Sequence, residues 1–325
     1  MLPLPLFRHH APTTLGEAVA LMAELGPEAR IVAGGTDLLP NMKHGIVEPE
    51  HLVSLSRVAE LSGVSVEEDV IAIGAMTKLD QLARHELLRA EATALAEACA
   101  LVGGPHHRRM GTLGGNVCLD TRCVYINQTY FWREALGFCL KKDGTQCHVV
   151  ASGKNCVAAA SNDSAPALIV LDAEIELYGP DGVRRLGASD FYVADGIVNT
   201  VKRPEEIVAR VLVPRRAAKQ TRFEKLRRRE AIDFPQLNTA VRLEVTDGKV
   251  SDVDLVVSTL AARPKRIKSV QKAIGEAPSE ALFDRLADLA FKQCRPLTNL
   301  DTDPEWRRDM VRVLVRKAFA RAALV

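Results

Sequence analysis

The chain has 325 residues, of which 47% are hydrophobic and 26% are charged, and this composition is ordinary for a globular protein. The length fits two or three structural units. The net charge of +2 argues against a broad nucleic-acid-binding surface. The N-terminus has no apolar signal region and no run of about 18 apolar residues suggests a membrane span, so we expect a cytoplasmic protein without nucleic-acid or membrane partners.

The first third of the chain mixes predicted helices and strands. Thr13 and Thr14 precede an apolar-periodic run that ends at Leu25, before Gly26, which predicts a capped helix. Short apolar runs predict strands at 30–33, 52–55 and 70–74. Residues 77–100 are rich in alanine and leucine and predict mainly helix, as two helices.

The remainder is predicted to be mostly antiparallel strands and C-terminal helices, with one irregular stretch. Residues 117–161 show no sustained period and predict a loop-rich insert. The tail from about residue 265 predicts three helices. Alternating apolar patterns predict the strands between these two regions, at 167–178, 183–186, 207–213, 238–245 and 253–258, with Asp247-Gly248 as a hairpin turn.

Two glycine-containing loops are candidate phosphate-binding sites. The segment 33–37, Ala-Gly-Gly-Thr-Asp, directly follows a predicted strand, and 111–116 is Gly-Thr-Leu-Gly-Gly-Asn. Glycine lets backbone amides approach a phosphate, and the side chains of Thr36, Thr112 and Asn116 could add hydrogen bonds. Each loop taken singly is more often a plain tight turn. Neither loop matches the Rossmann or P-loop pattern, and no regular helix or strand is expected to pass through so many glycines.

Five of the seven cysteines lie between Cys118 and Cys156. In a reducing compartment such a cluster favours metal binding over disulfides. Four of the cysteines have the spacing C-x15-C-x7-C-x8-C, and they are Cys123, Cys139, Cys147 and Cys156. Four thiolates can hold a [4Fe–4S] cluster or a structural Zn²⁺. Zinc sites usually use closer cysteine pairs, but this spacing alone leaves cluster, zinc and unligated thiols open.

The two loops, followed by Asp-Ser-Ala-Pro-Ala-Leu at 163–168, resemble the FAD-binding medium subunits of the xanthine dehydrogenase and carbon monoxide dehydrogenase family. The resemblance covers essentially the whole chain, including Phe-Glu-Lys-Leu at 223–226. It implies an α+β fold: a two-part FAD-binding domain with a mainly antiparallel sheet in its larger part, and a small C-terminal α+β domain. The implied boundaries are 1–55, 56–217 and 218–325, with three strands in the last domain.

The resemblance also implies which residues contact FAD, while no residue of the chain is expected to be catalytic. Residues 31–38 and 111–116 would line the diphosphate and ribityl groups, Asn162 and Asp163 would bond the polar middle of the cofactor, and Lys225 would lie near the isoalloxazine. A solvated basic face is the alternative for Lys225. The complete implied set is Ile31, Val32, Ala33, Gly34, Gly35, Thr36, Asp37, Leu38, Gly103, Gly111, Thr112, Gly114, Gly115, Asn116, Cys118, Asn162, Asp163 and Lys225.

The cysteine-rich stretch is an addition to that family pattern. In the usual pattern the Gly-Gly-Asn loop is followed within roughly ten residues by the Asp-x-x-Pro-Ala-Leu segment, whereas here about forty more residues intervene, at 119–160. This insert resembles that of the β subunits of 4-hydroxybenzoyl-CoA reductases, which binds a [4Fe–4S] cluster. By this resemblance Cys123, Cys139, Cys147 and Cys156 are the ligands. Cys118 is not a ligand and could touch the flavin, and His148 is a minor ligand candidate.

The resemblance to these reductases implies a path for electrons. Reduced ferredoxin would supply the [4Fe–4S] cluster, and electrons would pass through FAD to a small subunit with two [2Fe–2S] clusters and then to a large molybdopterin subunit, which removes the phenolic hydroxyl. The expected assembly is a dimer of heterotrimers. Two alternatives stay open: the FAD subunit of an oxidising molybdenum hydroxylase with an added cluster, and a zinc-stabilised nucleotide-binding regulatory module.

Overall fold

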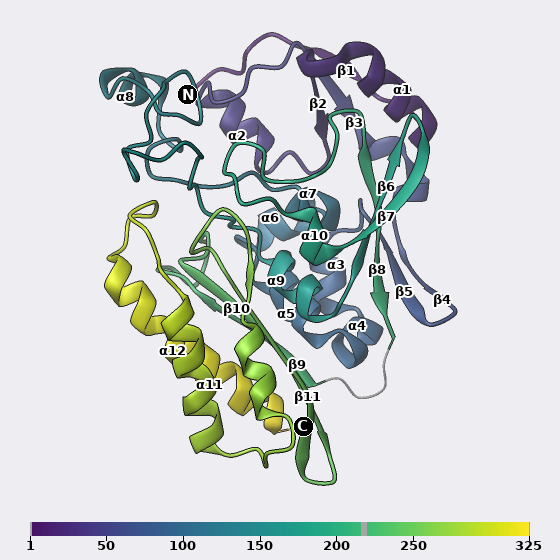
Figure 1. The fold of residues 1–325 in the computed structure, drawn as a ribbon. Coiled ribbons are helices and arrows are strands. Elements are labelled where there is room, and N and C mark those ends of the chain that lie inside the picture. Colours follow the sequence, from purple (N-terminus) through teal and green to yellow (C-terminus); the bar gives the residue numbers. More distant parts are fainter. Residues whose placement is uncertain (1, 216–219, 325) are drawn as a thin grey trace.

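The computed structural model describes residues 2–215 and 220–324. Within these residues the strands form three sheets, ordered β1-β3-β2, β4-β5-β8-β6-β7 and β12-β11-β10-β9. Figure 1 shows the first sheet at the top, the second at the right and the third at the lower left, with the 119–160 insert beside the first. The mixed α+β class and the mainly antiparallel sheets confirm the predicted fold class.

The N-terminal unit is a parallel three-stranded sheet with two helices. Its first helix begins as predicted, because the Thr14 side chain accepts a hydrogen bond from the Glu17 amide and Glu17 bonds back in a capping box, and it ends at Gly26. The elements are β1 (Arg8–His10), α1 (Leu15–Leu25), a 3₁₀ turn (Gly26–Glu28), β2 (Ala29–Val32), α2 (Leu38–Lys43), β3 (His51–Ser54) and 3₁₀ turns at Leu55–Arg57 and Ala59–Leu61.

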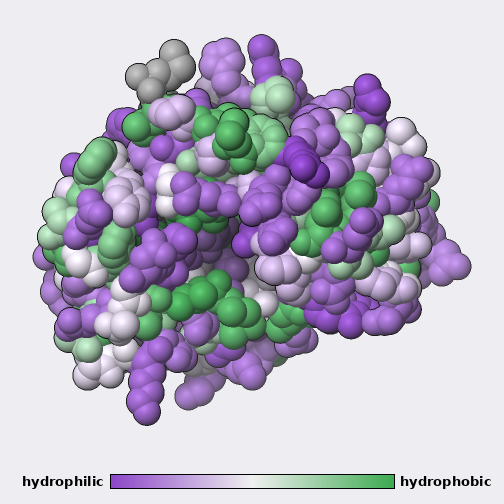
Figure 2. Space-filling model, turned by 90° about the horizontal axis from the view of Figure 1, so that it is seen from above, coloured by the Kyte–Doolittle hydropathy of each residue, from purple (hydrophilic) through white to green (hydrophobic). Residues whose placement is uncertain are grey.

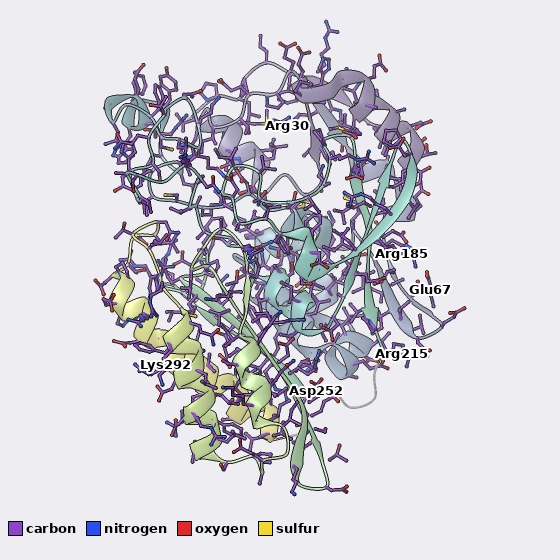
Figure 3. All side chains as sticks on the ribbon, in the orientation of Figure 1. Arg30, Glu67, Arg185, Arg215, Asp252 and Lys292 are labelled. Atoms are coloured by element: carbon purple, nitrogen blue, oxygen red, sulfur yellow. The ribbon has the colours of Figure 1, made fainter. Side chains whose placement is uncertain are left out.

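The second unit is a five-stranded antiparallel sheet with helices packed on one face. On its other face Glu176 accepts hydrogen bonds from Arg185 and Arg210, and Arg210 also pairs with Glu67, so part of this face is ionic. Figure 3 labels Glu67 and Arg185 of this ionic group. The strands are β4 (Val64–Glu67), β5 (Val70–Gly74), β6 (Glu174–Gly179), β7 (Gly182–Gly187) and β8 (Ile207–Pro214). The helices are α3 (Leu79–Arg84), α4 (Glu86–Glu91), α5 (Thr93–Leu101), α6 (Pro105–Met110), α7 (Leu113–Val117), α9 (Ser164–Val170) and α10 (Ala188–Phe191).

Three sequence predictions in this unit are wrong. The first half of the predicted strand 167–178 lies in helix α9, whose residues are all buried, and a fully buried apolar run carries no period that separates strand from helix. Helix α7 passes through Gly114 and Gly115, because the Thr112 side chain caps it and every amide finds an acceptor. Residues 77–100 form three short helices instead of two.

The C-terminal unit packs two long helices on a four-stranded antiparallel sheet. Asp247 and Gly248 both have positive φ, 52° and 73°, and form the predicted hairpin turn. Two details differ from the predictions: the sheet gains a two-residue fourth strand, and the first of the three expected helices is a 3₁₀ segment (Lys268–Ala273). The elements are β9 (Gln220–Leu226), β10 (Leu237–Thr246), β11 (Lys249–Ser258), β12 (Lys265–Arg266), α11 (Glu280–Gln293) and α12 (Pro304–Ala323).

The insert is loop-rich, as predicted, and contains one short helix, α8 (Tyr130–Ala135). Its stem is closed by reciprocal backbone hydrogen bonds between Arg122 and Ala159, at 2.8 and 2.7 Å. The buried Arg133 side chain donates to the carbonyls of His44 and Gly45, which follow α2, and thereby attaches the insert to the N-terminal unit. No helix in the described ranges is both long and apolar enough to cross a membrane.

Candidate cofactor sites

The two glycine loops lie against each other. A Cβ atom added at Gly34 would lie 2.3 Å from the carbonyl oxygen of Met110 and 2.9 Å from the Cα atom of Gly111. A Cβ atom at Gly111 would lie 3.7 Å from Thr36 Oγ1. Only glycine fits at residue 34, because the opposing atoms belong to the backbone and cannot move aside. The structure thus brings together two loops that are distant in sequence.

The two loops use their backbone amides differently. In the second loop the amide of Gly111 donates to His107, those of Leu113 and Gly114 donate to Thr77 and Ala75, and that of Gly115 donates to Thr112 Oγ1. For the amides of residues 34–37, the described part of the chain contains no acceptor. Backbone amides that point away from internal acceptors form an anion-binding cradle. Most amides of the second loop are thus used within the chain, and its contact with FAD stays a prediction.

The predicted asparagine contacts are made largely within the chain. The side-chain oxygen of the buried Asn116 accepts from the amide and the hydroxyl of Ser164, at 3.0 and 2.6 Å, which ties the second loop to α9. Asn162 donates to the carbonyl of Val117 at 3.3 Å. These bonds fix the wall behind the cradle, and direct contact of Asn116 and Asn162 with FAD remains a prediction.

Lys225 is completely buried, so the alternative of a solvated basic face is wrong for this residue. Its ammonium group donates to Asp163 Oδ2 at 2.9 Å and to the carbonyls of Leu101 and Asp233 at 2.9 and 3.0 Å, which uses its three donors. Burial raises the pKa of Asp163, while the charge of Lys225 and a hydrogen bond from Asn238 oppose that shift. The hydrogen bonds of Lys225 therefore hold the C-terminal sheet against α5 and against the start of α9.

The other predicted FAD residues surround this core at different depths. Residues 31–38 are all half-buried, so this edge of the N-terminal unit stays accessible to a ligand. Gly103 has a φ of 48°, and a Cβ atom there would lie 3.0 Å from His107 Cβ. Cys118 follows α7, and burial raises the pKa of its thiol. Figure 2 shows a hollow in the upper face of the molecule, with hydrophobic side chains along part of its rim.

The four predicted metal ligands line a single pocket. Cys123, Cys139, Cys147 and Cys156 are each 7–9% exposed, and they share the pocket with Tyr125, Ile126, Leu140, Lys141, His148, Val149, Val157 and Ala158. Burial, together with the three neighbouring thiols, raises the pKa of Cys123 to about 11. The fold thus brings the four thiols to one pocket although the cysteines are separated by at least seven residues in the sequence.

The spacing of the sulfur atoms distinguishes two kinds of site. Among the described residues, the metal-ligating atoms that gather within 4.8 Å of one another belong to Glu28, Glu50 and His51, so no three of the four cysteine sulfurs are that close. Tetrahedral Zn²⁺ with bonds of about 2.3 Å requires sulfurs about 3.8 Å apart. The four thiols are therefore not spaced as a tetrahedral zinc site requires.

His148 lies beside the pocket with its ring already engaged. Its Nε2 atom is 2.5 Å from the carbonyl oxygen of Phe138, and its ring centroid lies 5.2 Å from that of Tyr125. One ring nitrogen of His148 is thus occupied by a backbone carbonyl. Lys141 closes another side, where its ammonium bonds Asp120 and Thr121 at 2.7 Å.

Sequence reasoning missed Arg122, which links the two candidate sites. Its guanidinium forms an ion pair with Asp37 of the first glycine loop and lies 4.3 Å from the centre of the Phe234 ring. Burial lowers its pKa to about 10, so the side chain is charged at neutral pH. An arginine in a loop without periodicity is expected to be exposed, and only its position directly before Cys123 could have drawn attention to it.

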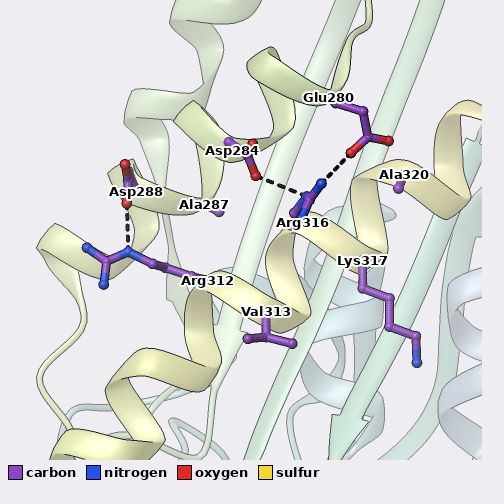
Figure 4. Close-up of a pocket in the computed structure, with 9 residues that line it drawn as sticks. All are labelled: Glu280, Asp284, Ala287, Asp288, Arg312, Val313, Arg316, Lys317 and Ala320. Atoms are coloured by element: carbon purple, nitrogen blue, oxygen red, sulfur yellow. Dashed lines mark hydrogen bonds and ion pairs between the residues drawn. The ribbon is translucent and has the colours of Figure 1, made fainter.

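A shallow surface pocket between α11 and α12 is a different kind of feature. Figure 4 shows that its charged side chains pair with one another: Asp288 with Arg312, and Glu280 and Asp284 with Arg316. These exposed ion pairs satisfy the polar groups of the groove. The glycine loops and cysteines are not among its lining residues, so we do not assign it a cofactor.

The sequence matches two families that together span the described domains. Residues 5–216 match the family described as the FAD binding domain in molybdopterin dehydrogenase, and residues 221–322 match the carbon monoxide dehydrogenase flavoprotein C-terminal domain. The chain belongs to the FAD-binding medium-subunit family of molybdenum hydroxylases. For this medium subunit, FAD binding therefore rests on the family as well as on the glycine loops.

Individual relatives extend along the whole medium subunit. The carbon monoxide dehydrogenase medium chain of Hydrogenophaga pseudoflava is 29% identical over 324 residues, which cover 99% of this chain and 98% of the relative. The glyceraldehyde dehydrogenase medium chain of Sulfolobus acidocaldarius is 24% identical, with coverage of 98% and 99%. The solved carbon monoxide dehydrogenase from Hydrogenophaga pseudoflava superposes with a TM-score of 0.82 at 29% identity, covering 99% of both chains.

Proposed function

We propose that this oxidoreductase subunit carries two redox centres: FAD at the 34–37 cradle and a [4Fe–4S] cluster held by Cys123, Cys139, Cys147 and Cys156. The observation that supports the second centre is the ring of four buried thiols around one pocket, spaced too widely for a single zinc ion. An iron–sulfur cluster carries one electron, and flavin exchanges one or two. The chain would therefore relay electrons between a one-electron donor or acceptor and partner subunits.

In this proposal the cofactor contacts follow the geometry of the site. The free amides of residues 34–37 hold the diphosphate, and the second loop braces them. Asp163 and Lys225 act on FAD as a fixed wall, because all three donors of the lysine are used within the chain. Bound FAD supplies the redox chemistry, and the residues of the chain bind it, orient it and exclude water.

The proposed partners are a large molybdopterin subunit and a small subunit with two [2Fe–2S] clusters, assembled as a dimer of heterotrimers. The names of the relatives support this, because they are called medium chains or FAD-binding subunits. Substrate chemistry then takes place on the large subunit, and the present chain delivers or receives electrons.

At the level of the substrate we propose a dehydroxylating 4-hydroxybenzoyl-CoA reductase with reduced ferredoxin as the donor. The insert supports this assignment, since it adds a one-electron site at the surface of an otherwise ordinary flavin subunit. Exposed aromatic residues of α8 lie close to that site: Phe131 is 81% exposed, and Trp132 contacts Tyr125 of the pocket wall with ring centroids 6.3 Å apart. A protein electron carrier could dock on such a surface.

A second candidate is the FAD subunit of an oxidising molybdenum hydroxylase with an added cluster. The names of the relatives favour it, since they include carbon monoxide, xanthine, glyceraldehyde and nicotinate dehydrogenases. The two candidates share the FAD and the cluster and differ in the direction of electron flow.

Metal and flavin analysis of the purified chain tests the two centres. We expect FAD and about four irons per chain, with a broad absorption near 400 nm. Cys139→Ser and Cys147→Ser should each lose iron yet still bind FAD supplied in excess, whereas Cys294→Ser, a buried cysteine outside the insert, should keep both. One zinc per chain without iron would contradict the cluster and favour a zinc-stabilised module.

Turnover of the assembled complex tests the direction. With reduced ferredoxin and 4-hydroxybenzoyl-CoA, the reductase proposal predicts loss of the phenolic hydroxyl. If the complex instead oxidises a substrate with a dye as acceptor and does not reduce the thioester, the second candidate holds.

A further inference from the structure

Arg122 occupies the junction between the two candidate sites. Its backbone pairs with Ala159 at the stem of the insert, and the next residue, Cys123, lines the cysteine pocket. On the other strand of the stem, the amide of Ala158 donates to Cys156 Sγ at 3.5 Å. Both sides of the stem are therefore connected directly to thiols of the pocket.

The Arg122 side chain extends from this stem to the first glycine loop. It pairs with Asp37, whose other carboxylate oxygen accepts from Asn41 Nδ2 at 3.1 Å, and its Nη1 lies 3.5 Å from Asn41 Oδ1. The arginine and aspartate side chains are 12% and 28% exposed, so water screens the pair only partly. The ring of Phe234, from the C-terminal unit, covers the guanidinium.

The charge of Asp37 makes this contact important for an anion-binding site. Asp37 belongs to the cradle whose amides have no acceptor in the described part of the chain. A carboxylate beside the diphosphate of FAD would repel it in a partly desolvated setting. Arg122 neutralises that carboxylate and holds it toward Asn41.

We infer that Arg122 is a positioning residue that couples filling of the cysteine pocket to FAD affinity: the filled pocket fixes the stem, and the stem holds Arg122 on Asp37. The inference rests on the proposed cluster, and it adds that the two centres assemble cooperatively. A chain without iron has a loosened stem, an uncompensated Asp37 and weaker FAD binding.

FAD titration of the full-length chain, with and without iron, tests the coupling. Removal of iron from the wild type by a chelator should weaken FAD binding by about tenfold, the size of a typical coupling between sites. Arg122→Gln should keep its iron and bind FAD about tenfold more weakly, and removal of iron from this variant should add little. Arg122→Lys should retain part of the affinity, because it keeps the charge but loses the fork geometry.

A charge rescue separates positioning from simple loss of packing. Asp37→Asn in the Arg122→Gln background removes the uncompensated carboxylate and should restore most of the FAD affinity. Arg242→Gln provides the matched control: this arginine is paired with Asp172, its side chain is 8% exposed, and it lies outside the insert. The control should leave the response of FAD affinity to iron unchanged.

Three results would overturn the inference while leaving the two-centre proposal intact. These are an unchanged FAD affinity in wild type after iron removal, an affinity of Arg122→Gln within about twofold of wild type, or an equal response to iron in both proteins. A chain that takes up no iron at all would overturn the coupling together with the proposed cluster.

Discussion

The FAD-binding face and the cysteine insert are built in opposite ways. Around the glycine loops, strand and helix ends are held by internal hydrogen bonds, and the buried lysine has all its donors used. The insert has one short helix, and three of the six buried members of its hydrophobic cluster are cysteines. Under the proposed function, a segment with so little apolar core gains its order from the bound metal. The flavin face is thus preformed, whereas under the proposed function the insert is completed by the metal that it binds.

Removal of two of the proposed metal ligands should produce the largest effect and should affect one region only. In the Cys139→Ser, Cys147→Ser double variant we expect proteases to cleave residues 119–160 at least about 100-fold faster, because local opening there no longer costs metal-binding free energy. Limited proteolysis followed by mass spectrometry measures this. Equal protection of the insert with and without metal would erase the contrast between the regions.

Substitution of Lys225 should test how strongly the flavin face is preformed. Lys225→Met leaves Asp163 buried without its charge partner, and we expect a loss of about 3–5 kcal/mol in the free energy of unfolding. Urea titration measures the loss. Addition of Asp163→Asn should recover part of it, since the unpaired charge is removed. A loss below about 1 kcal/mol for Lys225→Met would mean that the buried pair does not hold the units together.

Gly34 tests the contact between the loops. Gly34→Ala places a Cβ atom 2.3 Å from the Met110 carbonyl, so we expect about 1–3 kcal/mol of destabilisation and at least about tenfold weaker FAD binding. Gly16→Ala is the matched control, because no atom lies within 4 Å of that Cβ position inside α1. The control should stabilise the helix by about 0.5–1 kcal/mol. Thermal melts and flavin fluorescence measure both variants, and unchanged binding in Gly34→Ala would separate the loop contact from the cofactor.

The smallest expected effect is on the pH dependence of stability through Glu206, which lies outside both the FAD-binding face and the insert. Burial raises the pKa of Glu206, but hydrogen bonds from Arg184 and Arg203 outweigh it and lower the pKa to about 2. The carboxylate therefore stabilises the fold above its unfolded pKa of about 4.5, and this contribution disappears as the pH falls toward 2. Glu206→Gln should lower the free energy of unfolding by about 2 kcal/mol at pH 7. The stability of this variant should also decrease less than that of the wild type as the pH falls. An unchanged acid limb in urea titrations from pH 6 to 3 would contradict this.

The sequence predicted those parts of the molecule that local rules govern. The capping box at Thr14, the hairpin at Asp247-Gly248 and most strands follow from periodicity and turn chemistry. Helix α9 was missed because a wholly buried apolar run has no polar face to reveal its period. The four cysteines of the insert line one pocket, and their role as metal ligands stays a prediction, since spacing alone left other outcomes open.

Contacts between distant segments lay beyond sequence reasoning. Arg122 meets Asp37 across the insert stem, and Lys225 spans three elements, so neither role has a local signature. The unequal use of amides by the two glycine loops was also invisible, since the acceptors Thr77 and Ala75 come from another part of the chain. Glycine content indicates where backbone is accessible, but only the fold decides whether its donors are free.

The closed stem of the insert means that the loop beyond it could be replaced by another loop. The hydrogen bonds between Arg122 and Ala159 hold the two ends of the insert together. The length of the loop between them therefore has little effect on the entropy of folding of the rest of the chain. Residues 123–158 could be exchanged for a tight turn, or for another metal-binding loop, that keeps the Arg122–Ala159 pair and leaves α7 and α9 in place. Two backbone hydrogen bonds would thus mark the points at which the proposed second redox centre can be exchanged.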